Sequence, residues 1–263
     1  MSAPAAPPRY PGAMEIQRQG EVAVVSLRAG RANAMDDAFL RGLLRLFDEL
    51  ESSDARAAVL TGYDTYFSAG LALPSLLGLD RQKITSFMVL FESAMRRVFA
   101  SPLPVVAAVN GHAIAGGCVL ALECDLRLIA DAPIKIGLNE VRLDLGLPAT
   151  AIEPLRLQVP ASSHLAIAVE GNLFAPSEAK QLGLVHEVVP PSELLSRSLE
   201  RARSLARGSR EAVAQVKRAL RGPALERMEN ASAPQLEKWV NAWFSSAAQE
   251  RLASAVAQIT KKR

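Results

Sequence analysis

Hydrophobic and polar positions follow two different periods in the first fifty residues of the chain. Residues 14–27, "MEIQRQGEVAVVSL", predict two short strands joined by a turn at Gly20. From Asp36 to Ser52 the apolar spacing becomes helical, and Asp36 is a suitable N-cap. The predicted buried face of this helix consists of Phe39, Leu40, Leu43, Leu44, Leu46, Phe47 and Leu50.

Strands and helices then continue to alternate. The predicted strands are "RAAVLTG" (56–62), "LPVVAAVNG" (103–111), "DLRLIAD" (125–131) and the short "IKIG" (134–137). Residues 81–100 predict an amphipathic helix, residues 111–124 turn into another helix, and "DTYFSAGLAL" (64–73) predicts a loop. This order predicts an α/β core with parallel crossover connections.

The rest of the chain is predicted to be mostly helical. The expected elements are helices at 162–170 and 176–182, a strand at 183–189, and helices at 192–207, 209–221 and 233–258. The last helix carries an apolar stripe that predicts a packing face or, alternatively, a subunit contact: Leu236, Trp239, Val240, Trp243 and Phe244. We find no internal repeat of fixed period. We divide the chain into a tail (1–13), a core (14–191) and a helical region (192–263).

Composition and charge exclude several classes of protein. The chain has 263 residues, of which 49% are apolar and 22% charged, as in ordinary globular proteins. A net charge of only +3 gives no field that demands nucleic acid as a partner. The Ala- and Pro-rich start predicts a disordered tail rather than a signal peptide, and no run of 18 apolar residues predicts a membrane span. We expect no nucleic acid and no membrane among the partners.

The cysteines and histidines predict neither a disulfide nor a metal site. Cys118 and Cys124 lie six residues apart, which places them on different faces of a helix. The histidines are scattered, at His112, His164 and His186, without ligand spacing. We therefore expect a cytoplasmic protein in a reducing compartment.

Basic residues are dense after Arg197, but acidic residues are interleaved with them. The pattern favours a solvated helix face. The alternative is a local patch for a ligand phosphate or a subunit contact.

The glycine-rich stretch "GHAIAGGCVLALEC" (111–124) raises the question of an anion site. Gly111 and Gly116 have the spacing of a phosphate loop, but Gly117 and Cys118 stand where Lys and Ser or Thr are needed. Ser68 in "YFSAG" lacks the first glycine of a nucleophile elbow, which argues against a serine hydrolase. The remaining interpretations are helix-start amides that stabilise a developing oxyanion, or glycines that permit close packing.

A second loop favours the oxyanion interpretation. "FSAGLAL" (67–73) follows one predicted strand just as "NGHAIAGG" (110–117) follows another. Ligands of such sheets bind beyond the carboxyl ends of the strands. Two amides from two loops are therefore expected to hold one carbonyl oxygen.

These two stretches together resemble the enoyl-CoA hydratase/isomerase (crotonase) superfamily. "AGRANAM" (29–35), "IGLNEV" (136–141) and "SEAKQLGLVHEVVP" (177–190) fit the same family, and the resemblance covers about residues 15–189. It implies a spiral of ββα units with a C-terminal helical region that builds homotrimers or homohexamers. It also implies an acyl-CoA or carrier-bound acyl thioester as substrate, with no separate cofactor.

The resemblance assigns candidate residues to this chemistry. It implies that the N–H groups of Leu71 and Gly116 hold a thioester enolate. The acyl-CoA loop then consists of Ala69, Gly70, Leu71, Ala72 and Leu73. Relatives usually carry Asp where this chain has Ala72, which puts a polar contact to the pantetheine arm or the loop geometry in doubt. Arg31 lies where relatives bind the nucleotide end of coenzyme A, so it is a candidate phosphate ligand or a plain surface arginine.

The carboxylates distinguish the reactions of the family. Its hydratases resemble one another in carrying two glutamates, and the first of these positions is Val119 here. Glu123 lies one helical turn, roughly 6 Å, further along and is expected to be a structural or surface acid. Glu140 occupies the second position, and "GLNE" resembles the Δ3,Δ2-enoyl-CoA isomerase branch. One acid suffices there, because it takes a proton from C2 and returns it at C4.

Glu140 needs a moderately raised pKa for this role. We expect the apolar surroundings of Ile136, Leu138, Val141 and Val119 to raise it, with Arg142 pointing away and Asn139 either orienting Glu140 or ending a turn.

Two groups of alternatives remain. One is another crotonase reaction, namely hydration of 2-enoyl-CoA or decarboxylation or isomerisation of a carrier-bound polyketide thioester, since "LTGYDTYF" (60–67) faintly resembles polyketide enzymes. The other is a non-catalytic acyl-CoA-binding member of the fold.

Overall fold

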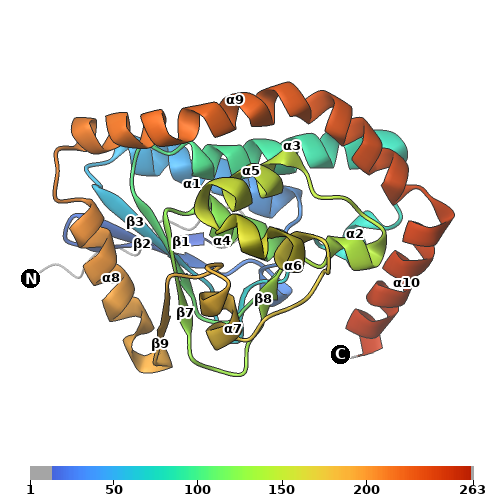
Figure 1. The fold of residues 1–263 in the computed structure, drawn as a ribbon, viewed down its shortest axis with the longest axis horizontal. Helices are drawn as coiled ribbons and strands as arrows, with labels where there is room; N and C mark the ends of the chain where they lie inside the picture. Colours follow the sequence, from blue (N-terminus) through green and yellow to red (C-terminus); the bar gives the residue numbers. More distant parts are fainter. Residues whose placement is uncertain (1–13, 262–263) are drawn as a thin grey trace, which may run out of the picture.

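The computed structural model describes residues 14–261, and the predicted tail of residues 1–13 lies outside them. Its centre is a six-stranded sheet in the order β1-β2-β3-β5-β7-β9 (Figure 1). The strands are β1 (Met14–Gln19), β2 (Val22–Leu27), β3 (Ala57–Thr61), β5 (Val105–Val109), β7 (Leu126–Ala130) and β9 (Glu187–Val189). β1 and β2 form the predicted antiparallel hairpin, and every other pair is parallel.

A smaller parallel sheet explains the repeat of the fold. Its strands are β4 (Tyr66–Ser68), β6 (His112–Ile114) and β8 (Ile136–Gly137). Each follows a strand of the large sheet and precedes a helix, namely α3 (Arg81–Phe99), α4 (Gly116–Glu123) or α5 (Ala149–Gln158). The chain therefore passes three times through a ββα unit after the hairpin, and the predicted α/β spiral is confirmed.

Several short elements were not predicted. The segment 64–73, expected to be a loop, contains β4 and the start of α2 (Leu73–Leu76). β6 lies in the stretch 111–124, which was predicted to turn into a helix, and α5 lies in a stretch without a prediction. Strands of two or three residues are too short to display a period, and Pro154 interrupts the helical pattern of α5.

Helices α1 (Asp37–Ser52) and α8 (Leu194–Leu205) pack beside the strands of the large sheet. α1 begins as predicted, because the Asp36 carboxylate accepts a hydrogen bond from the Phe39 amide at 2.8 Å. α1 packs against α3, and α8 packs against β3, β5 and β7. Two short helices, α6 (His164–Ala168) and α7 (Pro176–Gln181), precede β9.

The C-terminal helices differ from the prediction. α9 (Arg210–Trp243) is one continuous helix of 34 residues through Pro223 and Pro234, and α10 (Ser246–Lys261) follows a turn (Figure 1). The predicted helices 209–221 and 233–258 are therefore wrong in their bounds. Each interior proline costs about 3 kcal/mol. Packing of α9 along α3 and α5 offsets this cost.

The apolar stripe at the end of α9 is a packing face within the chain. Trp239, Val240 and Trp243 are buried, and the two indole rings stack with centroids 5.3 Å apart. Leu236 and Phe244 pack against the same core.

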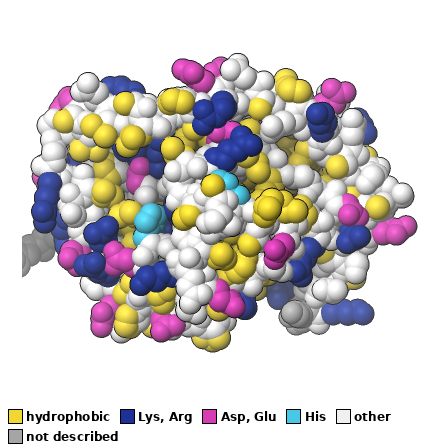
Figure 2. All heavy atoms as spheres, in the orientation of Figure 1, with side chains coloured by type: hydrophobic (Ala, Val, Ile, Leu, Met, Phe, Trp, Pro, Cys, Tyr) yellow, Lys and Arg dark blue, Asp and Glu magenta, His cyan; other side chains and the backbone are white. Residues whose placement is uncertain are grey.

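Two basic residues of the C-terminal region are buried, contrary to the predicted solvated face. Lys217 Nζ lies 2.6 Å from Asp125 Oδ2, and Arg221 Nη2 lies 2.9 Å from Asp125 Oδ1. These pairs attach α9 to the start of β7, and Arg221 also stacks over the Phe99 ring. Elsewhere the prediction holds: Arg197 pairs with surface acids, and Figure 2 shows both signs of charge interspersed.

No helix within residues 14–261 is long and apolar enough to cross a membrane.

Candidate active site

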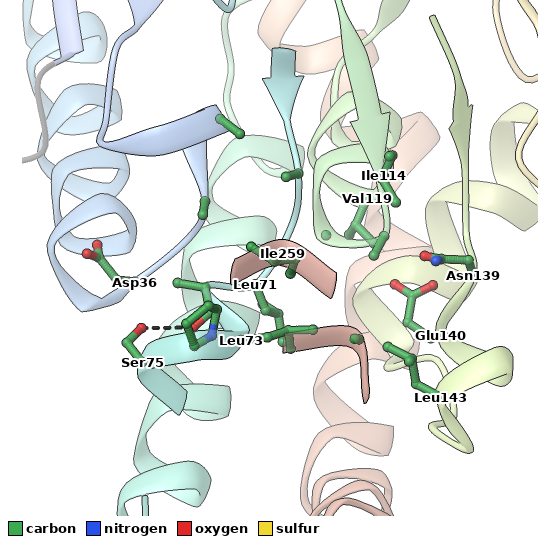
Figure 3. A pocket seen from close by; sticks show the side chains of 18 of the residues that line it. Asp36, Leu71, Leu73, Ser75, Ile114, Val119, Asn139, Glu140, Leu143 and Ile259 are labelled. Atoms are coloured by element: carbon green, nitrogen blue, oxygen red, sulfur yellow. Dashed lines mark hydrogen bonds between the residues drawn. The ribbon is translucent and has the colours of Figure 1, made fainter. Parts of the chain in front are cut away.

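A pocket of about 720 Å³ opens at the ends of the strands that carry the two small-residue loops. The predicted site residues that line it are Arg31, Ala69, Leu71, Ala72, Leu73, Gly116, Val119 and Glu140. Gly70 is the predicted residue that does not line it. Figure 3 shows Glu140 and Asn139 on one side of the pocket and Asp36 and Ser75 on the opposite side.

The first loop presents the Leu71 amide. Met35 N donates to Gly70 O at 2.8 Å, and Ala72 N donates to Met35 O at 3.0 Å, so the loop is paired on both sides of Leu71. Gly70 has a φ of +81°, and a Cβ there would lie 2.9 Å from Gly116 N. Among the described residues, no acceptor is bonded to the Leu71 amide.

The second loop presents the Gly116 amide, which is the first of α4 and has no intrahelical acceptor. The residue before it, Ala115, has a φ of +51°, in the left-handed region that costs a non-glycine residue about 1–3 kcal/mol. Its amide donates to Gly137 O at 2.9 Å, which holds this conformation in place. The strained turn directs the start of α4 toward the pocket.

The glycines of this stretch permit close packing, which was one of the two interpretations considered above. A Cβ on Gly117 would lie 2.1 Å from Ser68 O, and one on Gly111 would lie 2.2 Å from the Thr65 carbonyl carbon. These two glycines are needed for close packing of backbone on backbone. At Gly116 the nearest contact would be 3.3 Å, to Gly70 Cα, so the two loops lie directly against each other.

Glu140 is the first residue of η2 (Glu140–Leu143), a short 3-10 helix beside the pocket. Burial raises the pKa of its carboxyl to about 7, although hydrogen bonding to the Glu140 and Asn139 backbone lowers it in part. Its Oε2 is inaccessible and has no hydrogen-bond partner among the described residues.

The surroundings of Glu140 agree with the expected ones. Ile136, Leu138 and Val119 are buried, and Val141 is half-buried. Arg142 points away, because its guanidinium hydrogen-bonds to Asn172 Oδ1.

Asn139 adds an unpaired acceptor to this side of the pocket. Its backbone carbonyl accepts from Arg142 N at 3.1 Å, which begins η2, so it takes part in a turn as one alternative proposed. Its side-chain Oδ1 is buried without a partner among the described residues. Figure 3 shows the Asn139 and Glu140 side chains next to each other at the pocket wall.

The other acids have different surroundings. Val119 is 1% exposed and lines the pocket, whereas Glu123 is fully buried on α4 and does not line it. Burial raises the pKa of Glu123 well above its ordinary value, so it is a structural acid rather than a surface one. The remaining acidic lining residue is Asp36, whose carboxylate caps α1. Arg31 is exposed and lies with Asp36 in the lining of the pocket.

The last helix supplies a wall that the sequence did not predict. Trp239 of α9 and Ala255, Gln258 and Ile259 of α10 line the pocket. α10 is attached to the turn after η2, because Arg251 Nε lies 2.6 Å from Asp144 Oδ2. An apolar stripe on a terminal helix was the available signal, but it did not specify what the stripe contacts.

No group of His, Cys, Asp or Glu within residues 14–261 is arranged to hold a metal ion, and Cys118 and Cys124 are buried free thiols. What the pocket does offer is two unpaired backbone amides from adjacent loops and, in apolar surroundings, one carboxyl whose Oε2 is unpaired. Amides at a helix start stabilise a developing oxyanion, and a carboxyl with a pKa near 7 moves a proton. Together with the ββα spiral, this defines the crotonase class of enzymes.

Comparison with known proteins gives the family. Residues 17–255 match the model of the enoyl-CoA hydratase/isomerase family, and the chain belongs to this family. It is 37% identical over 198 residues to a putative enoyl-CoA hydratase of Thermus thermophilus, covering 72% of this chain and 74% of the relative. It is 33% identical over 181 residues to human mitochondrial enoyl-CoA delta isomerase 1, covering 68% of this chain and 60% of the relative.

The fold is similar to that of the human mitochondrial delta3-delta2-enoyl-CoA isomerase. The crystal structure of that enzyme superposes with a TM-score of 0.90 at 27% identity, covering 95% of this chain and 99% of the other. The relatives include both hydratases and isomerases, so they establish the enzyme family and not the particular reaction.

Proposed function

We propose that this enzyme shifts the double bond of 3-enoyl-CoA to give 2-enoyl-CoA, with Glu140 as the only acid/base. The observation that carries the proposal is Val119. A buried valine lines the pocket where the hydratases of the family are expected to carry a second glutamate. Addition of water requires a proton donor and a positioned nucleophile, whereas a double-bond shift requires one proton carrier.

The reaction follows from the two amides and the carboxyl. The thioester carbonyl oxygen lies between the N–H groups of Leu71 and Gly116. The Glu140 carboxylate removes a proton from C2, and the electron pair of that C–H bond forms the enolate. The enolate then collapses to the conjugated 2-enoyl thioester while the Glu140 carboxyl returns the same proton to C4. No atom is gained or lost, so no cofactor beyond the coenzyme A of the substrate is required.

The electrostatics of the pocket support both halves of this cycle. A carboxyl with a pKa of about 7 is close to equally stable with and without its proton at neutral pH, so it serves as base and as acid. Removal of one oxyanion-hole donor costs about 10²- to 10³-fold in rate in a serine protease, which sets the scale for such a contact. The Leu71 and Gly116 amides need no reorganisation, because the strained turn at Ala115 and the bridge to Met35 already fix them.

Hydration of 2-enoyl-CoA is the second candidate, and one observation favours it. The unpaired, buried Oδ1 of Asn139 beside Glu140 offers an acceptor for a water molecule. In that case Glu140 alone would activate the water and later supply the proton.

The test compares 3-enoyl-CoA and 2-enoyl-CoA as substrates of the wild type and two variants. Glu140→Gln keeps the shape of the side chain but removes the proton carrier, and we expect isomerisation to fall at least about 10²-fold. Glu92→Gln is the matched control, because Glu92 is a buried acid of α3 with a raised pKa outside the pocket. This variant should keep its activity.

The outcomes separate the candidates. Hydration of 2-enoyl-CoA at a rate comparable to isomerisation would favour the second candidate and contradict the reasoning from Val119. Binding of both thioesters without turnover would indicate a non-catalytic member of the family.

A further inference from the structure

The Leu71 amide is unpaired, whereas the amides of its neighbours along the chain are all paired. In the run of residues 69–72, the amides of Ala69, Gly70 and Ala72 each donate a hydrogen bond within the protein. Their acceptors are, in order, Ala32 O at 2.9 Å, Ser68 Oγ at 3.2 Å and Met35 O at 3.0 Å. Two of these acceptors are backbone carbonyls. The third, Ser68, is a side chain.

Ser68 joins two segments that are distant in the sequence. Its hydroxyl donates to Asn33 O at 2.8 Å and accepts from Gly70 N at 3.2 Å. The side chain is completely buried and does not line the pocket, so it does not contact a ligand. The hydroxyl is therefore a bridge between the segment around Asn33 and the loop that carries Leu71.

The segment around Asn33 is a fixed anchor. Ala32 and Asn33 have φ values of +60° and +50°, so two consecutive non-glycine residues are held in the left-handed region. The buried Asn33 side chain holds them with three hydrogen bonds, from Nδ2 to Leu27 O and Phe67 O at 2.9 Å each, and to Oδ1 from Ala29 N at 2.8 Å. A carbonyl fixed in this way gives the Ser68 hydroxyl a single position.

Ser68 also lies against the second loop. The close approach of its carbonyl oxygen to Gly117 leaves no room for a side chain at that glycine. A shift of Ser68 would therefore change the position of Leu71 relative to the start of α4, where Gly116 lies.

We propose that Ser68 is a positioning residue that orients the Leu71 amide toward the thioester carbonyl oxygen. It acts through the hydrogen bond to Gly70 N, with Asn33 as its anchor. The inference rests on the proposed function in requiring a thioester oxyanion between Leu71 and Gly116. It does not depend on whether isomerisation or hydration follows.

The experiment compares Ser68→Ala with a matched control, Ser101→Ala. Ser101 is 1% exposed, and its Oγ accepts from the amide two residues on, Leu103 N at 3.3 Å, as Ser68 does from Gly70. Ser101 does not line the pocket. Both variants lose a buried hydroxyl, but only one loses the contact to the oxyanion loop.

Two measurements report on the position of the Leu71 amide. The first is kcat and KM for 3-enoyl-CoA. We expect kcat of Ser68→Ala to fall about tenfold to a hundredfold with KM within about twofold, because a misplaced oxyanion donor weakens the transition state more than substrate binding. The second is the infrared carbonyl stretch of bound saturated acyl-CoA with a ¹³C-labelled thioester carbonyl. Binding should lower this frequency in the wild type and in Ser101→Ala, and lower it less in Ser68→Ala.

The carbonyl stretch separates the failure of this inference from that of the proposed function. If the wild type does not isomerise 3-enoyl-CoA, the proposed function is wrong and the stretch alone decides the role of Ser68. Three results would each overturn the inference. The carbonyl stretching frequency could be the same in wild type and Ser68→Ala, or binding could leave it unchanged in the wild type. The third is a loss of kcat in Ser101→Ala equal to that in Ser68→Ala. Should Ser68→Ala fail to fold, Ser68→Cys fills the site with a slightly larger group that is a weaker hydrogen-bond donor and acceptor, and the same direction of change is expected.

Discussion

Replacement of Glu140 by Gln should make the folded protein more stable at alkaline pH while abolishing its activity. The carboxyl ionises in an apolar pocket, and its pKa rises from an ordinary 4.5 to about 7. This difference corresponds to about 3 kcal/mol by which folding disfavours the charged form. A glutamine at the same position carries no charge and does not incur this cost.

The sign and the pH window follow from proton binding. Between pH 4.5 and about 7, the native state holds a proton on Glu140 that the unfolded state has released. The free energy of unfolding of the wild type therefore falls as pH rises through this window and levels off above it. Relative to Glu140→Gln, we expect the wild type to lose about 2 to 3 kcal/mol between pH 5 and pH 8.

The assay is urea unfolding of both proteins at pH 5 and pH 8, at one protein concentration, followed by far-ultraviolet circular dichroism. Taking the difference between the two proteins at each pH cancels the titration of all other groups. The altered packing of the glutamine amide changes the free energy of unfolding equally at both pH values, so its effect cancels in the comparison. Glu92→Gln should change stability with the same sign, because burial also raises the pKa of Glu92.

One result would refute the reasoning. If wild type and Glu140→Gln differ in stability by the same amount at pH 5 and pH 8, the folded protein does not hold a proton on Glu140 in this window. The carboxyl would then ionise like an ordinary glutamate, and its carboxylate would be a weaker base for removing the proton from C2.

Three further predictions concern other contacts. The kcat/KM for 3-enoyl-CoA should rise about tenfold per pH unit below pH 7 and level off above it, because the carboxylate form of Glu140 is the base; a profile flat from pH 5 to 8 would contradict this. Asp125→Ala leaves Lys217 and Arg221 buried without their anion, and urea unfolding should show a loss of about 3–5 kcal/mol. Trp239→Ala removes a buried ring, so thermal unfolding should show a loss of stability of about 3–5 kcal/mol. It also enlarges the pocket, so kinetics with a series of acyl-CoAs should show a preference for longer chains.

The sequence predicted the long elements more completely than the short ones for a physical reason. α1, α3 and the longer strands of the large sheet have enough residues to display a period, and α1 also has the N-cap Asp36. β4 and β6, which were missed, have three residues each, and β8 lies within the predicted strand 134–137; strands this short left no repeat of fixed period for the ββα unit in the sequence. α9 was split at its prolines because propensity is local, whereas the packing that holds it is not.

The candidate site was predictable only where it is local in sequence. The amide-bearing loops and Glu140 lie in short motifs, and the apolar surroundings that raise the pKa of Glu140 are neighbours in the chain or one helix away. Ser68 was considered only as a failed hydrolase nucleophile, because a single serine does not reveal its bond to Asn33 O. The contribution of α10 joins residues more than a hundred positions apart, and no local pattern contains that information.

The position of α10 has a consequence for the order in which the pocket is made. The ribosome releases the loops around Leu71 and Gly116 first, whereas the wall residues around Ile259 emerge more than a hundred residues later. At usual rates of synthesis the delay is roughly ten seconds. During this interval the amide-bearing loops have been synthesised, but the residues of α10 that line the pocket have not. Under the proposed function, the wall that shields the enolate from water is therefore synthesised after both amide-bearing loops, with α10.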